Sequence, residues 1–325
     1  MDALEKMAFN ALPTQTTDDY NMKQYFQIAN QVQVSRGVFD FSLPFDRGMN
    51  NVFGLRSGYT CCTSNMHQGW TKFASHLWYT RHDGGLAALQ YGPNQLQTVV
   101  NNQVVVIDEK TNFPFDETIE FEFSMEKPVK FQFELRIPSW CKEATVTVNG
   151  GSPSKFKGGH MISIETEWKD KDKLVLHLPM EVTTSNWGKN SRAIERGPLV
   201  YALKLEERWE KGNEPTEGDY MSVYPTQPWN YGLLKQVIDD PSANLKVTQR
   251  PVGEKFVWNI HNAPIEISAP ARKIPNWKVV DGVAHQPITD RTGIYKGEVS
   301  NEVEKITLVP YGCTKVRVVA FPVVK

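Results

Sequence analysis

The chain has 325 residues, a formal net charge of −1, 40% hydrophobic residues and 22% charged residues. This length is enough for two or three domains of roughly 100–150 residues each. The composition is that of a globular protein and not of a disordered one. No basic stripe interleaved with aromatic residues occurs, so we expect no nucleic-acid partner. The apolar runs are too short to span a membrane, so we expect no membrane partner either.

Residues 1–83 are predicted to form helices and loops. Apolar residues recur at helical spacing at Leu4, Met7, Ala8 and Leu12. The start of the chain does not have the pattern of a signal peptide. Because a helix begins at residue 1 without a capping residue, we expect a piece of a longer chain. The compartment is therefore not predicted, and the parent protein could be secreted, periplasmic or cytoplasmic.

After Gly84-Gly85 the hydrophobic period changes from about 3.6 to 2, which indicates strands. Alternating segments follow at residues 119–123, 131–137, 145–148 and 174–178. Asn149-Gly150 has the composition of a tight hairpin turn. Short strands with turn signals roughly every ten residues are typical of an antiparallel β-sandwich. We therefore predict a middle β-sandwich over residues 84–182.

A second β region is predicted over residues 183–325. Its strands are expected at residues 197–203, 256–260, 265–267 and 316–321. Residues 206–232 are rich in Glu, Gly, Pro and Trp, which favours a long surface insertion. The region is predicted to be a second β-sandwich at the C-terminal end of the chain.

The adjacent cysteines Cys61 and Cys62 stand just before a predicted helix over residues 64–78, which Ser64 or Asn65 could cap. A helix start favours a thiolate, and a thiolate is both a nucleophile and a soft metal ligand. Zinc sites usually pair cysteines at wider spacing. Buried free thiols, a vicinal redox pair and a metal or catalytic site therefore all remain open.

The other candidate residues carry weaker signals. Cys141 and Cys313 stand alone and are predicted to be buried and inert. His67 is near enough in sequence to the cysteines to contact a ligand there, and a structural role is the alternative. Glycosidases need a matched pair of carboxyl groups or another nucleophile. Glu5 does not suggest such a group, because it is expected to be solvated on its helix.

Four segments resemble glycoside hydrolase family 127, formerly a domain of unknown function. Tyr59-Thr60-Cys61-Cys62-Thr63-Ser64-Asn65-Met66-His67-Gln68-Gly69-Trp70 is similar to the family's Cys-Cys motif. The other three segments are Leu135-Arg136-Ile137-Pro138-Ser139-Trp140, Glu195-Arg196-Gly197-Pro198-Leu199-Val200-Tyr201 and Leu308-Val309-Pro310-Tyr311-Gly312-Cys313-Thr314. They occur in the family's order, which makes chance similarity a poor explanation.

The resemblance implies a helical (α/α)₆ barrel followed by two antiparallel β-sandwiches, with residues 1–83 as the last part of the barrel. It implies hydrolysis, with retention, of terminal β-L-arabinofuranosyl or related sugars in plant-type arabinose-containing glycans. Zinc is the implied cofactor. Carried over, Cys61 would be the nucleophile and a zinc ligand, and Cys62 a second zinc ligand. The resemblance also leaves open a homodimer through a β-sandwich. From its position after the cysteines, and not from the resemblance, His67 is the candidate substrate-binding residue.

Two departures from the family bear on activity. The family's Glu-x-Cys ligand pair does not occur in this chain, and its general acid/base Glu is not found either. The family's Tyr-x-Asn-Pro stretch reads Ile28-Ala29-Asn30-Gln31, which loses a tyrosine. We therefore expect an incomplete and inactive portion of a glycosidase. The alternatives are a non-catalytic carbohydrate-binding or assembly module made of two β-sandwiches, and a redox protein with a vicinal disulfide.

Overall fold

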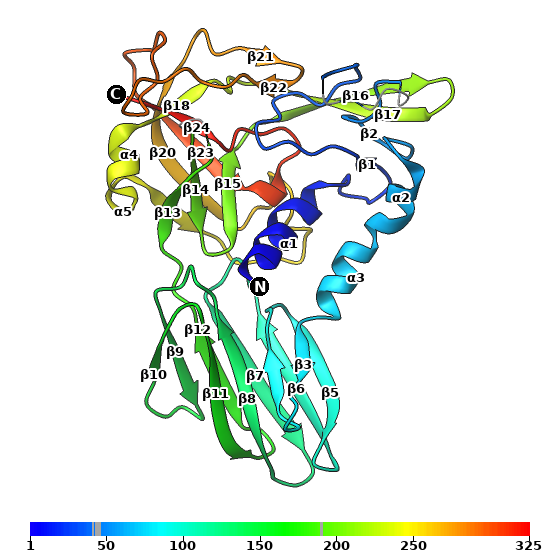
Figure 1. The fold of residues 1–325 in the computed structure, drawn as a ribbon, viewed down its shortest axis with the longest axis vertical. Helices are drawn as coiled ribbons and strands as arrows, with labels where there is room; N and C mark the ends of the chain where they lie inside the picture. Colours follow the sequence, from blue (N-terminus) through cyan, green and yellow to red (C-terminus); the bar gives the residue numbers. More distant parts are fainter. Residues whose placement is uncertain (41, 43–46, 189–190) are drawn as a thin grey trace. The chain divides into compact units, whose positions relative to one another are not determined.

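The computed structural model describes residues 1–40, 42, 47–188 and 191–325, and it is mainly β, as predicted (Figure 1). Compactness divides the chain into two units. Unit 1 consists of Met1–Lys6 and Trp70–Glu181, and unit 2 of Met7–Gly69 and Val182–Lys325. The division into a barrel remnant and two β-sandwiches at residues 83 and 182 stays a prediction.

Unit 1 contains two sheets. The strand order of the first is β10 (Ser154–Lys157), β9 (Glu143–Val148), β12 (Lys173–His177), β7 (Thr118–Met125), β6 (Gln103–Thr111), β5 (Asn94–Val100). The order of the second is β11 (His160–Trp168), β8 (Val129–Ile137), β4 (Leu86–Ala88), β3 (Trp78–Thr80). The alternating segments at 119–123, 131–137, 145–148 and 174–178 are thus strands, because one face of each is apolar.

The core of unit 1 is aromatic and is shared by both sheets. Phe123 of β7 stacks on Trp168 of β11 with ring centroids 4.1 Å apart. Phe121 of β7 contacts Phe133 of β8 edge-on at 5.2 Å. These pairs join one sheet to the other, and all four rings are buried. Such pairs add about 0.5–1.5 kcal/mol each beyond the area that they bury.

The predicted turn at Asn149-Gly150 is confirmed. Both residues have positive φ, 50° for Asn149 and 70° for Gly150. The N–H of Gly151 donates to the carbonyl of Val148 at 2.9 Å. Two consecutive positive φ values define the turn that matches the twist of an antiparallel hairpin.

Arg136 of β8 binds the first turn of α1 (Asp2–Thr14) inside unit 1. Its guanidinium donates to Glu5 and, at 2.6 Å, to Asp2. The indole N–H of Trp140 donates to the second Glu5 oxygen at 2.9 Å. Glu5 is fully buried, so the prediction of a solvated Glu5 is wrong. An ion pair with added hydrogen bonds offsets part of the cost of burying this carboxylate.

The buried face of α1 agrees only in part with the predicted one. Ala8 is buried as its spacing indicates, and so is Phe9, whereas Leu4 is 40% and Met7 60% exposed. The helix itself was predicted correctly, since Asp2–Thr14 is helical. Apolar spacing identified the helix but only part of its core side.

Unit 2 contains an eight-stranded sheet. Its order is β13 (Val182–Asn186), β14 (Ser191–Arg196), β15 (Leu199–Leu203), β23 (Glu304–Pro310), β20 (Ile265–Lys273), β18 (Tyr231–Leu234), β24 (Phe321–Val324), and β19 (Lys246–Gln249) pairs with β20. β24 also pairs with β14, which closes six of these strands into a ring. In the described part of unit 2, the large sheet therefore closes on itself. Closure removes exposed strand edges.

A smaller sheet of unit 2 has the order β1 (Lys23–Gln24), β2 (Phe53–Gly54), β17 (Gly218–Pro225), β16 (Glu207–Glu214). Residues 206–232, predicted as a long surface insertion, contain the hairpin β16–β17, which pairs with β2. The other elements are α2 (Thr60–Met66), α3 (Gln68–Ala74), α4 (Lys235–Asp239), α5 (Pro241–Asn244), β21 (Val279–Val280), β22 (Val283–Ala284) and the 3₁₀ turn Tyr311–Cys313.

Two strands predicted in unit 2 are wrong. Residues 256–260 form bends and turns, with the Asn259 side chain accepting hydrogen bonds from the N–H groups of His261 and Asn262. Of residues 316–321, only Phe321 belongs to a strand. Both segments are apolar because they are partly or fully buried, not because they are paired.

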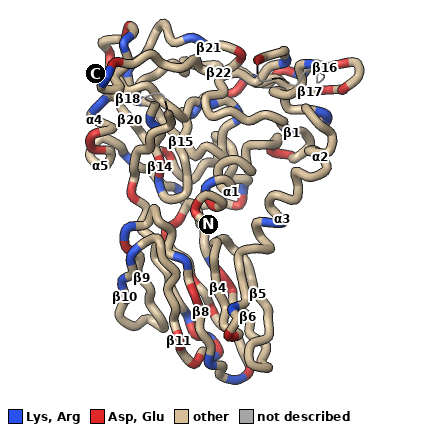
Figure 2. The backbone as a smooth tube through the Cα atoms, viewed as in Figure 1, with Lys and Arg blue, Asp and Glu red and all other residues tan. Residues whose placement is uncertain are grey.

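Charged residues of both signs are interspersed along each unit (Figure 2). Within the described ranges, no helix combines the length and apolarity needed to cross a bilayer.

Candidate active site

Cys61 and Cys62 lie in the first turn of α2, not ahead of a helix as predicted. Tyr59 is the N-cap and makes no capping bond through its side chain. The predicted cap at Ser64 or Asn65 is therefore wrong, and the amide of Asn65 instead donates to the Cys61 carbonyl at 2.7 Å. The predicted single helix is two short helices, separated at His67.

The four cysteines differ sharply in exposure. Cys61 is exposed and Cys62 half-buried, and α2 has no buried residue. Cys141 and Cys313 are buried, as predicted. Burial raises the pKa of the Cys141 thiol to about 11, and it raises that of Cys313 further. Only the adjacent pair is therefore accessible to a ligand.

Two residues that the sequence did not indicate lie beside the pair. The Tyr25 hydroxyl lies close to the Cys62 sulfur, and this interaction lowers the pKa of the Cys62 thiol. The ammonium group of Lys23 is 5.3 Å from the centre of the Tyr25 ring and donates to the Ser57 carbonyl. Lys23 is 1% exposed, and it interacts electrostatically with both thiols. A buried cation next to two sulfurs favours their anionic forms.

The pKa of Cys62 is nevertheless raised. Burial is the largest cause, followed by the hydrogen bond to Cys61 and the charge of Cys61, while Lys23 and Tyr25 act in the opposite direction. The helix start does not reverse this balance, so the Cys62 thiol keeps its proton at neutral pH. A metal cation bound at the sulfurs would deprotonate them.

The backbone just before α2 passes close to the Tyr25 ring at Gly58. The φ of Gly58 is +63°, and a Cβ at this position would lie 2.1 Å from Cγ of Tyr25. Tyr59, the next residue, contacts the Tyr25 ring edge-on at 5.8 Å. A glycine in this conformation directly before Tyr59 and the cysteines is the one sequence signal that could have indicated a close neighbour.

The two sulfurs fit a soft cation such as zinc as part of a ligand set. Among residues 1–40, 42, 47–188 and 191–325, no group of three His, Cys, Asp or Glu side chains is placed to hold a metal. His67 is exposed and follows the last residue of α2, so it does not complete such a group. A tetrahedral site needs two further ligands.

The segment Ile28-Ala29-Asn30-Gln31 has a structural role. The Asn30 side chain accepts hydrogen bonds from the N–H groups of Val319 and Ala320, both at 2.9 Å. The amide of Gln31 donates to the Lys315 carbonyl at 2.8 Å. This segment therefore holds the C-terminal residues in place, and the tyrosine beside the cysteines comes from position 25.

Residues 85–180 match the family model for the GH127 β-L-arabinofuranosidase middle domain. Three solved structures share the fold over 99–100% of this chain: a glycoside hydrolase (18% identity, TM-score 0.68), a GH127 β-L-arabinofuranosidase from Geobacillus stearothermophilus T6 (20%, 0.66) and a GH127 β-arabinofuranosidase (18%, 0.64). The family model thus matches the middle of the chain, and the likeness to the solved structures shows a shared fold. The chain covers 48%, 46% and 45% of those structures, so it spans about half their length. No curated protein matches it in sequence.

Proposed function

We propose that this chain carries the cysteine part of the active site of a retaining glycosidase that releases terminal β-L-arabinofuranosyl or related units from arabinose-containing glycans. Its similarity to GH127 supports a glycoside hydrolase family. The observation that carries the finer proposal is the pair Cys61 and Cys62, accessible at the start of a helix with no buried residue. The preceding helical residues would belong to a helical barrel.

Cys61 is the proposed nucleophile because its side chain is the more exposed of the two. Its sulfur would attack the anomeric carbon while the glycosidic carbon–oxygen bond breaks and the general acid protonates the leaving oxygen. Water would then displace the sulfur from that carbon, which releases the sugar and returns the thiolate. Cys62 is a proposed zinc ligand with Cys61, and zinc would keep both sulfurs deprotonated. The charge of Lys23 and the hydroxyl of Tyr25 stabilise the anionic sulfurs and orient them.

The same proposal holds that the chain does not hydrolyse glycosides by itself. It contains no Glu-x-Cys sequence, and no described group of three metal-ligating side chains includes the pair. The proposal assigns the two remaining zinc ligands and the general acid to residues outside these 325. Without them the sugar is not positioned for reaction.

Metal binding and thiol labelling test the proposal. Titration with Co²⁺ should give a sulfur-to-metal absorption band, weak because only two ligands are present, and both Cys61→Ser and Cys62→Ser should remove it. Cys141→Ala is the matched control, since that thiol is buried, and it should leave the band unchanged. Iodoacetamide should modify Cys61 first.

Three results would contradict the proposal. One is a Co²⁺ band that survives the loss of both adjacent cysteines. Another is preferential labelling of Cys141 or Cys313 in the folded chain. Hydrolysis of an aryl β-L-arabinofuranoside by the chain, abolished by Cys61→Ser, would support the nucleophile but overturn the proposed inactivity.

A further inference from the structure

A separate pocket of about 540 Å³ lies within unit 2. Four segments line it: residues 17–22, the hairpin β16–β17, residues 259–261 and residues 313–315. Neither Cys61 nor Cys62 is among its lining residues. Pockets of roughly 300–1,000 Å³ accommodate small organic molecules.

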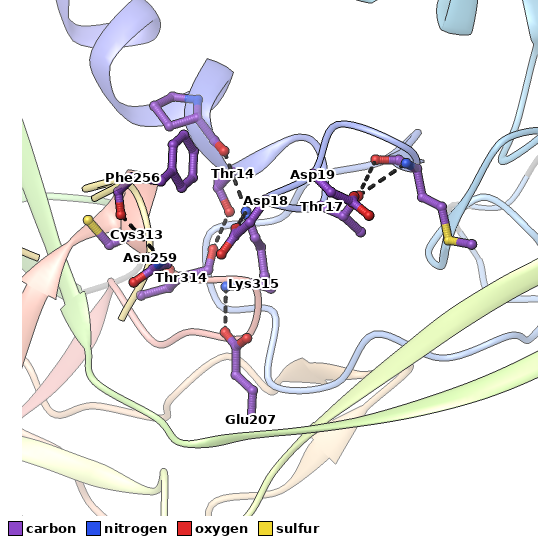
Figure 3. A network of polar contacts seen from close by, with 12 residues as sticks. Thr14, Thr17, Asp18, Asp19, Glu207, Phe256, Asn259, Cys313, Thr314 and Lys315 are labelled. Carbon is purple, nitrogen blue, oxygen red and sulfur yellow. Dashed lines mark hydrogen bonds and ion pairs between the residues drawn. The ribbon is translucent and has the colours of Figure 1, made fainter. Parts of the chain in front are cut away.

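The polar part of this pocket is built around Lys315, which is 3% exposed. Its ammonium group is 3.3 Å from Oδ1 of Asp18 and 3.4 Å from the Pro13 carbonyl oxygen. Figure 3 shows Lys315 between Asp18 and Glu207. An ammonium group has three donors and a carboxylate about four acceptor positions. Lys315 and Asp18 therefore keep hydrogen-bonding capacity after pairing with each other.

Glu207 connects two segments that line the pocket. One oxygen accepts from the backbone N–H of Lys315 at 2.8 Å, and the other accepts from the indole N–H of Trp209 at 3.2 Å. Trp209 also packs on Phe53, with ring centroids 5.4 Å apart. The Trp209 ring and the backbone of residue 315 are thus held in place before any ligand arrives, which lowers the entropic cost of binding.

The chemistry of the lining favours a neutral ligand with several hydroxyl groups. Asp18 pairs with Lys315, and the other two carboxylates of the lining, Asp19 and Glu207, accept hydrogen bonds from neighbouring residues. Among the described residues that line the pocket, Lys315 is the only lysine or arginine, and it is already paired, which disfavours an anionic ligand. A hydroxyl group, in contrast, can donate to the carboxylate and accept from the ammonium group at once. Trp209, Met22 and Met221 supply apolar surface for the C–H face of a sugar ring.

We propose that this pocket is a carbohydrate-binding site for one or two sugar units, separate from the cysteine pair. Its lining combines a fixed aromatic ring, apolar side chains and an Asp18–Lys315 pair with spare donors and acceptors. The inference goes beyond the proposed glycosidase function and does not require it. The site would bind sugar without cleaving it.

Saturation-transfer NMR with methyl pentosides and methyl hexosides tests the proposal on the full chain. We expect saturable binding with a Kd on the order of 1 mM, as for a small ligand of this size. Asp18→Ala and Trp209→Leu should each weaken binding at least about tenfold. Circular dichroism and thermal unfolding check that both variants are folded.

The matched control is Asp239→Ala, which removes a carboxylate of another Asp–Lys ion pair, one that lies outside the pocket. It should leave sugar binding unchanged, as should the Cys61→Ser/Cys62→Ser double variant. Absence of saturable sugar binding would overturn the proposal, as would binding that is lost only with the cysteines. Choline or inorganic phosphate binding in place of sugars, sensitive to Asp18→Ala, would overturn the ligand class.

Discussion

Two nearly buried cations, one in each unit, are used in different ways. Arg136 in unit 1 is 5% exposed, and Lys315 in unit 2 is 3% exposed. The guanidinium of Arg136 donates to Glu5, to Asp2 at 2.6 Å and to the Leu89 carbonyl at 2.5 Å. The N–H groups of Arg136 therefore have short hydrogen bonds to these partners, and Glu5 has no contact with solvent.

Lys315 has looser contacts. Its nearest carboxylate, Asp18, is 3.3 Å away and has a side chain that is 45% exposed. The pocket also reaches Lys315. The comparison teaches that burial of a cation does not by itself define its role. A cation enclosed by buried partners stabilises the fold, whereas one whose partner remains in water can also bind a ligand.

Arg136→Met tests the enclosed cation most severely. The substitution leaves Glu5 buried with Trp140 as its remaining partner among the contacts described here. Breaking a buried ion pair by removing one partner costs about 3–5 kcal/mol. We expect a loss of this size in the free energy of unfolding of unit 1, measured by urea unfolding followed through Trp fluorescence.

Lys130→Met is the matched control for Arg136→Met. Lys130 lies on the same strand, and both it and its partner Glu165 are exposed, at 68% and 52% of their side chains. An exposed pair contributes about 0–1 kcal/mol. Equal losses in the free energy of unfolding of the two variants would show that the buried ion pair of Arg136 contributes no more stability than an exposed pair. Adding Glu5→Gln to Arg136→Met should restore part of the stability.

The sequence predicted features that depend on local pattern. The strands of unit 1 and the Asn149-Gly150 turn follow from alternation and turn chemistry within a few residues. Burial of Glu5 depends on Arg136, which lies 131 residues away. The ion pair of Glu5 with Arg136 could not be predicted from the sequence of the helix, where apolar spacing predicted a buried face that includes Leu4 and Met7.

The candidate site was predicted to a similar extent. The Cys-Cys pair is visible in the sequence, and the burial of Cys141 and Cys313 follows from their isolation. Lys23 and Tyr25 were missed because they come from a separate strand segment more than thirty residues earlier. The hairpin at residues 207–225 was missed for the same reason, since it pairs with β2 from the first part of the chain.

Glu109→Gln extends the comparison to a buried carboxyl group whose hydrogen-bond partners are neutral. Glu109 is 2% exposed and accepts hydrogen bonds from Gly92 N–H at 2.9 Å and from the Asn94 amide at 2.7 Å. Burial raises its pKa from 4.5 to about 8. The unfolded chain therefore loses this proton at lower pH than the folded chain does.

The contribution of Glu109 to stability should accordingly be highest below about pH 4.5 and should fall as the pH rises toward about 8, by at most about 1.4 kcal/mol per pH unit. Above that pH the contribution is constant. Glu109→Gln should flatten this part of the stability profile, measured as urea midpoints between pH 5 and 8. An unchanged slope in the variant would assign the pH dependence to other groups.

Lys315→Met should have the smallest effect of the three. The Asp18 carboxylate stays hydrated after the substitution because its side chain is 45% exposed. The contact of Glu207 with the backbone N–H of residue 315 does not depend on the side chain. We therefore expect a loss of about 1–2 kcal/mol, that of an ordinary buried polar contact, and less than half of that in Arg136→Met. Thermal unfolding of unit 2 measures it, with the exposed Lys235→Met as control. A loss of stability in Lys315→Met as large as that in Arg136→Met would contradict this prediction, because it would mean that Asp18 is not hydrated after the substitution. Lys315 would then stabilise the fold in the same way as Arg136, and the proposed sugar pocket would lose the pair with spare donors and acceptors on which it depends.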